Sequence, residues 1–336
     1  MFQSFEPSDN CLYERELLRK QEKTSLRRNM SFVGALSLVL TLVMQFAFTV
    51  VVVFLLRTGV LSSEGLTDPF LGMGNTAYLL MYSLIYVGAL LIPALVVALC
   101  YKKRENPFSP AESVPFGFVL LMIIGAVGLC MLTNIINSII LTIFQELGLN
   151  VPDAPQMMDD TFVSFLLNLF VIAVLPALLE EMIYRGYILR VLRPYGNLYA
   201  VMISSMLFSL MHGNLRQIPF AFLVGLVLGY AYIATNNIWI PIAIHFANNA
   251  ISVTMEYFAF SLPVDYQGAY YGVVIYGLAA IGVLATIMLI ACYHRRMRIA
   301  KTNDILMTKD RYAAMFTTPL FVAATALYAV LLFVEI

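Results

Sequence analysis

The chain has 336 residues, of which 61% are hydrophobic and only 12% are Asp, Glu, Lys or Arg. Soluble domains hold about 45–50% apolar and about 25% charged residues, so this excess cannot be buried in a water-soluble core. Many apolar runs are long enough to cross a bilayer as helices, which excludes a β-barrel. The formal net charge is zero, so bulk charge indicates no nucleic-acid partner.

Nine apolar runs follow one another along the chain: 32–56, 77–100, 116–144, 162–184, 198–212, 217–235, 238–257, 270–293 and 314–334. Each is read as a helix by its length, and the fifth is unusually short. We therefore predict an all-α, polytopic transmembrane bundle of eight or nine spans. Its parts are a charged leader at 1–31, spans one to three within 32–159, a four-span segment at 160–257 and two C-terminal spans within 258–336.

The basic residues predict the orientation, because Lys and Arg accumulate in cytoplasmic loops. They gather in the leader, at 102–104, at 185–193 and at 295–311, and leave only Arg57 and Arg216 on the other side. The N-terminus should therefore be cytoplasmic and the C-terminus outside. We expect an integral, multi-pass protein of a bacterial cell membrane. The first run lacks a small-residue cleavage site, so it should be an anchor and not a cleaved signal peptide. We expect a solvated leader in preference to a helix lying on the inner leaflet.

Ionisable side chains inside spans are costly and mark functional sites. Six polar side chains lie in the fourth, fifth and seventh runs: Glu180, Glu181, Arg185, His212, His245 and Asn249. Glu181 and Arg185 have the i, i+4 spacing of an ion pair. Adjacent residues are about 100° apart on a helix, so Glu180 and Glu181 should not face one partner and Glu180 should stay free. His245 and Asn249 are again i, i+4 and should share a helix face.

A turn at 194–197 should join the fourth and fifth runs into an antiparallel hairpin. Glu180 and His212 lie 16 residues before and after Gly196, so they should reach the same depth, about 24 Å from the tip, and could share a water. Glu180 could deprotonate that water. His245 and Asn249 could donate hydrogen bonds to the oxyanion that forms when an amide is attacked.

Three short motifs carry a specific resemblance. EEMIYR at 180–185, FSLMH at 208–212 and HFANN at 245–249 resemble the EExxxR, FxxxH and HxxxN motifs of the CPBP (Abi-like) family of intramembrane proteases, in the family's order. That family includes the CAAX prenyl endopeptidases and bacteriocin-processing or immunity proteins. The resemblance covers about residues 160–256 and implies a catalytic core with its site facing the cytoplasmic side.

The resemblance also implies roles for these residues. Glu180 with His212 would activate water, His245 with Asn249 would form the oxyanion site, and Glu181 with Arg185 would support them. The expected function is an intramembrane endopeptidase that cuts near the cytoplasmic face, in CAAX-type or peptide-precursor processing. Its partners would be the bilayer and a peptide or membrane-protein substrate, and the residues name neither that substrate nor an oligomeric state.

Two alternatives stay open. Glu180, His212 and His245 could bind zinc in a metalloprotease, because two His and a carboxylate suit catalytic zinc. We favour no cofactor, since HExxH is absent and Asn249 is a poor zinc ligand. The polar cluster could instead serve a transporter or a non-catalytic membrane scaffold. Paired, interrupted helices in two related halves would indicate a transporter, and the sequence lacks them.

Other residues carry structural signals. Gly225 and Gly229 form a GxxxG pair, which predicts a helix contact face in the sixth span. Four cysteines without a CxxC pair should be reduced and have no role in the site: Cys11, Cys100, Cys130 and Cys292.

Overall fold

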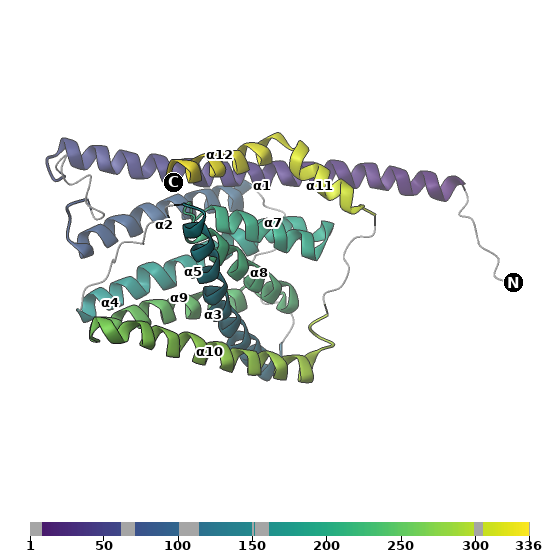
Figure 1. Ribbon diagram of the computed structural model, residues 1–336. Coiled ribbons are helices and arrows are strands. Elements are labelled where there is room, and N and C mark those ends of the chain that lie inside the picture. Colours follow the sequence, from purple (N-terminus) through teal and green to yellow (C-terminus); the bar gives the residue numbers. More distant parts are fainter. Residues whose placement is uncertain are drawn as a thin grey trace.

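The computed structural model describes residues 9–61, 71–100, 114–149, 151, 161–298 and 305–335, and this part of the chain is helical, without strands. Each of the nine predicted runs coincides with helical structure (Figure 1). The helices are α1 (Asp9–Arg57), α2 (Asn75–Cys100), α3 (Phe116–Glu146), a continuous helical rod over 162–195, α7 (Asn197–Leu210), α8 (Ile218–Thr235), α9 (Trp239–Phe260), α10 (Val264–Tyr293), α11 (Thr308–Thr317) and α12 (Pro319–Glu335). The protein is a polytopic helical membrane bundle.

Not every helix is long and apolar enough to cross a bilayer alone. Among the described residues six helices meet that test, and a seventh span results if α11 and α12, bent by 68°, count as one. Helix α7 has 14 residues and reaches only about 21 Å, which is less than the roughly 30 Å of the hydrocarbon layer. The predicted number of eight or nine spans therefore stays a prediction.

The leader is helical and contacts the C-terminal helices, which we did not predict. From Asp9 onward it is the first part of α1, whose 49 residues extend about 74 Å, beyond the end of the bundle (Figure 1). Its basic side chains bind α11: Arg19 Nε lies 2.8 Å from Asp310 Oδ2, and Lys23 Nζ lies 2.9 Å from Asp310 Oδ1. The Asp310 side chain is only 4% exposed. This ion pairing joins the start of the chain to its C-terminal helices.

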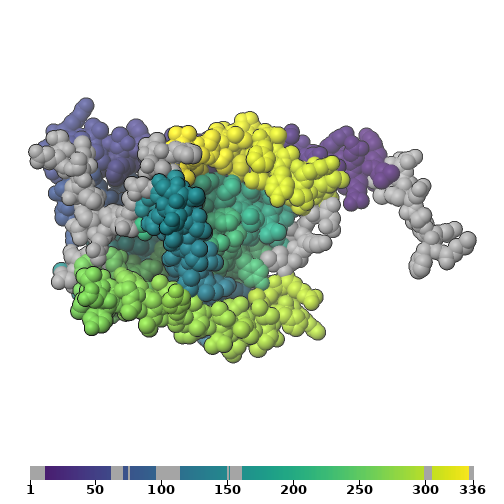
Figure 2. All heavy atoms as spheres, viewed as in Figure 1, coloured from purple at the N-terminus to yellow at the C-terminus, as the bar shows by residue number. Residues whose placement is uncertain are grey.

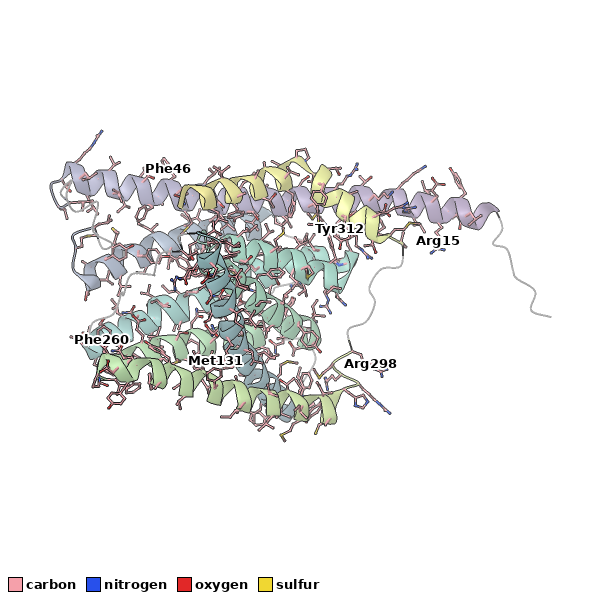
Figure 3. The ribbon with its side chains drawn as sticks, viewed as in Figure 1. Arg15, Phe46, Met131, Phe260, Arg298 and Tyr312 are labelled. Carbon is pink, nitrogen blue, oxygen red and sulfur yellow. The ribbon has the colours of Figure 1, made fainter. Side chains whose placement is uncertain are left out.

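The described basic segments lie toward one end of the bundle. Arg15 at the start of α1 and Arg298 after α10 point to the same side in Figure 3, and Phe260 lies at the opposite end. This agrees with the prediction that the basic segments lie on one face of the membrane. The basic residues at 102–104 lie outside the described residues, and the assignment of this end to the cytoplasm stays a prediction.

The predicted hairpin of the core is present. The chain reverses at Gly196, whose φ of 135° favours glycine, and α7 then packs back on the rod. Helix α8 packs on α7 through the GxxxG pair. A Cβ at Gly225 would lie 3.0 Å from Ser205 Cβ, and one at Gly229 would lie 3.0 Å from Val201 Cγ1. The predicted contact face is therefore confirmed.

The core helices lie between two outer layers. Helix α12 runs along α1 on one side, and α10 runs along the other (Figures 1 and 2). Helix α10 meets α3 where Gly282 faces Gly128, because a Cβ on either residue would lie 2.3 Å from the Cα of the other. Cys130 on α3 is buried and Cys292 on α10 is exposed, and both are free thiols. The side chains of Cys11 and Cys100 lie outside the described part.

Candidate active site

The rod over 162–195 is not a uniform α-helix. It consists of α4 (Phe162–Asn168), the π-helix η2 (Leu169–Val174), α5 (Leu175–Glu181), the π-helix η3 (Met182–Leu189), α6 (Arg190–Leu192) and the 3₁₀ turn η4 (Arg193–Tyr195). Single π turns inside α-helices are frequent at functional sites. Glu180 and Glu181 end α5, and η3 begins directly after them. The two carboxylates therefore lie at a change of helical geometry.

Glu181 and Arg185 form the predicted ion pair, and both are fully buried. Arg185 Nη1 donates to Glu181 Oε1 at 2.7 Å, and Arg185 Nη2 donates to the backbone carbonyl of Gly225 at 3.0 Å. His245 Nδ1 donates to the same Glu181 Oε1 at 2.9 Å. One carboxylate oxygen thus links the rod to α9, and the guanidinium links it to α8.

His245 lies between the two carboxylates. Its Nδ1 contacts Glu181, and its Nε2 lies 3.9 Å from Glu180 Oε2. The prediction that neighbouring Glu180 and Glu181 cannot face one partner is therefore wrong. An imidazole has nitrogens on two sides of its ring, so carboxylates that point in different directions can each address one of them.

Glu180 is not free, contrary to our expectation. It is 4% exposed, and its Oε1 accepts a hydrogen bond from the hydroxyl of Tyr86 on α2. Its Oε2 has no hydrogen-bond partner in the described part of the chain. Sequence reasoning missed Tyr86 because it lies 94 residues before Glu180, in an apolar run where a tyrosine reads as packing.

His212 follows the last residues of α7 and is half-buried. Its Nδ1 donates to the backbone carbonyl of Phe208 at 2.9 Å. No hydrogen bond or ion pair between described residues joins it to Glu180, so the prediction that these two hold one water is untested. The estimate of equal depth assumed a regular α-helix, and the π turn η3 lies between Glu180 and the hairpin tip.

Phe208, the first residue of the FxxxH motif, connects these groups. Its ring centroid is 5.1 Å from that of His212 and 5.8 Å from that of His245, both edge to face. The guanidinium of Arg185 lies over the same ring, 4.6 Å from its centroid. Because the phenylalanine touches both imidazoles and the buried cation, its side chain positions all three.

Asn249 lies one helical turn beyond His245 and contacts the rod. Pro176 has no N–H, so the carbonyl of Ile172, four residues earlier, lacks its α-helical donor. Asn249 Nδ2 donates to that carbonyl at 2.9 Å, and Asn249 Oδ1 accepts from Asn248 Nδ2 at 3.0 Å. A carboxamide has two N–H donors, so one of them can still bind another acceptor.

The predicted zinc ligands are Glu180, His212 and His245. Among the described residues, no three His, Cys, Asp or Glu side chains are grouped closely enough to hold one ion. Of the three predicted ligands, His245 Nε2 and Glu180 Oε2 lie 3.9 Å apart. The predicted ligand set is therefore not grouped as a metal site in the described residues, and metal dependence stays untested.

Comparisons with known proteins agree with the motifs. Residues 162–251 match the model of the type II CAAX prenyl endopeptidase Rce1-like family. The chain is 29% identical over 102 residues to the putative membrane peptidase YdiL of Bacillus subtilis, covering 30% of this chain and 42% of YdiL. It is 26% identical over 175 residues to the membrane-embedded CAAX protease MroQ of Staphylococcus aureus, covering 49% of this chain and 70% of MroQ. No solved structure matches the chain.

The match to the family model includes every motif residue, from Glu180 to Asn249, and both relatives are bacterial membrane proteins. The apolar helices around this segment agree with an integral, multi-pass protein. Residues 162–251 therefore resemble the Rce1-like CAAX prenyl endopeptidases, and the two relatives support an intramembrane protease of the CPBP family.

Proposed function

We propose that this protein is an intramembrane endopeptidase that hydrolyses a peptide bond near the cytoplasmic membrane face. One observation carries the proposal: Glu180 is buried, has one oxygen without a hydrogen-bond partner in the described residues, and directs that oxygen toward His245. A buried carboxylate oxygen without a hydrogen-bond partner is costly, and a catalytic role is one reason why such a group is kept. The match of residues 162–251 to the Rce1-like family model supports the same reading.

Glu180 would act as the general base. Two polar atoms 3.9 Å apart are too far for a direct hydrogen bond but can be bridged by water. A water between Glu180 Oε2 and His245 Nε2 would lose a proton to Glu180 as its oxygen attacks the carbonyl carbon. His212 would assist this step through Nε2, because its Nδ1 proton is already donated to Phe208.

His245 and Asn249 would stabilise the oxyanion. In a neutral His245 ring the single proton lies on Nδ1, facing Glu181, so Nε2 can donate only when the ring is protonated. The Glu181 carboxylate would balance that positive charge and hold the ring in place, as the acidic member of a catalytic triad does. The second N–H of Asn249 would supply the other donor.

The proposed mechanism uses no metal, because no three His, Cys, Asp or Glu side chains group together among the described residues. Metal analysis of purified protein, together with activity after exposure to a chelator, tests this part. Full activity without bound metal is the expected result. Loss of activity on chelation, restored by zinc, would contradict the glutamate-based mechanism.

The substrate is best found by comparing peptides in membranes and medium of cells that carry the wild type or Glu180→Gln. A peptide that appears only with the wild type is then offered to the purified protein. Loss of a general base lowers activity by about 10²–10⁴-fold, and we expect this of Glu180→Gln. Glu256→Gln makes the same change on α9, about 16 Å along the helix from His245, and should retain activity. Equal cutting by the wild type and Glu180→Gln would refute the catalytic assignment.

A further inference from the structure

Tyr86 contacts the proposed general base from outside the part of the chain that matches the family model. It lies on α2, whereas the match covers residues 162–251. Tyr86 is 7% exposed, and its hydroxyl donates to Glu180 Oε1. A helix of the N-terminal half therefore contributes a polar group to the site.

The Tyr86 ring is held by its own helix. Tyr78, Tyr82 and Tyr86 follow at i, i+4 spacing and stack along one face of α2. The ring centroids of Tyr82 and Tyr86 are 5.9 Å apart with planes inclined by 22°, and those of Tyr78 and Tyr82 are 6.3 Å apart with planes inclined by 16°. Because packing fixes the ring, the hydroxyl meets the carboxylate in a preset position.

This contact decides which oxygen of Glu180 is available. Oε1 is occupied by the Tyr86 hydroxyl, whereas Oε2 has no partner among the described residues and lies 3.9 Å from His245 Nε2. Without the phenol, the carboxylate could rotate about its last bond, because terminal carboxylate torsions are broad.

We propose that Tyr86 is a positioning residue, which orients the Glu180 carboxylate so that Oε2 faces His245 and the reacting water. The inference rests on the proposed function of Glu180. It adds a residue of α2 to the proposed active site.

The test compares Tyr86→Phe, Tyr82→Phe and Glu180→Gln in the full-length protein, with the peptide identified as above. Tyr86→Phe should lower kcat about tenfold or more, with KM almost unchanged, because the Glu180 carboxylate is no longer held with Oε2 toward His245. The acid limb of its pH–rate profile should move to higher pH, because the ionised carboxylate has lost a donor. Tyr82→Phe, which keeps the stack and removes a neighbouring hydroxyl, should behave as the wild type.

Replacing Tyr86 by 3-fluorotyrosine keeps the ring and its packing and makes the phenol a stronger donor. The acid limb should then move to lower pH, which a merely structural tyrosine would not cause. Wild-type kcat and an unchanged pH profile in both Tyr86 variants, with Glu180→Gln inactive, would overturn the positioning role and leave the proposed function intact. An active Glu180→Gln would instead refute the proposed function, and the role of Tyr86 with it.

Discussion

Arg185→Met tests how strongly the buried cluster depends on its cation. Methionine keeps much of the length of the stem but removes the guanidinium that donates to Glu181 at 2.7 Å and to the Gly225 carbonyl at 3.0 Å. The fully buried Glu181 carboxylate would then keep its hydrogen bond from His245 but lose the positive charge of Arg185. Removing one partner of a buried pair costs about 3–5 kcal/mol, and we expect a loss of unfolding free energy in that range.

A double-mutant cycle separates the pair from the packing of Arg185. The unfolding free energy of Arg185→Met, Glu181→Leu and the double variant would be measured by denaturant titration in mixed micelles. Because the double variant has no unpaired charge at these positions, it should be more stable than the sum of the single losses predicts, by at least about 2 kcal/mol. Arg185→Met with wild-type stability, or strictly additive losses, would refute the reasoning.

Three further outcomes follow from the packing and charge of the bundle. Gly282→Ala should cost about 1–3 kcal/mol of unfolding free energy, because its Cβ would lie 2.3 Å from Gly128 Cα. The control Gly277→Ala has nothing within 4 Å of its Cβ and should be near neutral in the same titration. Asp310→Asn should speed tryptic cleavage of the first part of α1, because this part loses its two ion pairs to α11. The control Glu16→Gln breaks only the exposed ion pair with Lys20 and should leave the cleavage rate unchanged. A reporter fused before residue 9 should be active only on the cytoplasmic side, and activity on the outer side would contradict the predicted orientation.

Local rules predicted much of this protein. Apolar runs of membrane-spanning length coincide with helices because a bilayer requires backbone groups to be paired within each segment. Glu181 and Arg185 pair as predicted because their contact depends only on i, i+4 spacing, which survives the start of the π turn. The GxxxG pair predicted the contact of α8 with α7 for a similar reason, since small side chains permit close approach wherever they lie on one face.

Contacts between distant segments could not be predicted in this way. The hydrogen bond from Tyr86 to Glu180 joins positions 94 residues apart, and no spacing rule connects them. The acceptor that Gly225 offers Arg185 is a backbone carbonyl, which every residue has. The leader was expected to be solvated, and no local rule predicted that Asp310, nearly 300 residues later, binds Arg19 and Lys23.

The buried charges are better explained by function than by stability. Replacing a buried ion pair with apolar residues of similar size is often neutral or stabilising, so folding alone gives no reason to keep Glu181 and Arg185 in a membrane bundle. Their geometry does give one, because Glu181 Oε1 receives both Arg185 and His245 and thereby fixes which nitrogen of the imidazole faces Glu180. The double variant Glu181→Leu with Arg185→Met should therefore separate the two properties: it should fold, and it should cut the peptide at least about 10²-fold more slowly than the wild type, because His245 has lost its support. A folded double variant with full activity would show that the pair is structural.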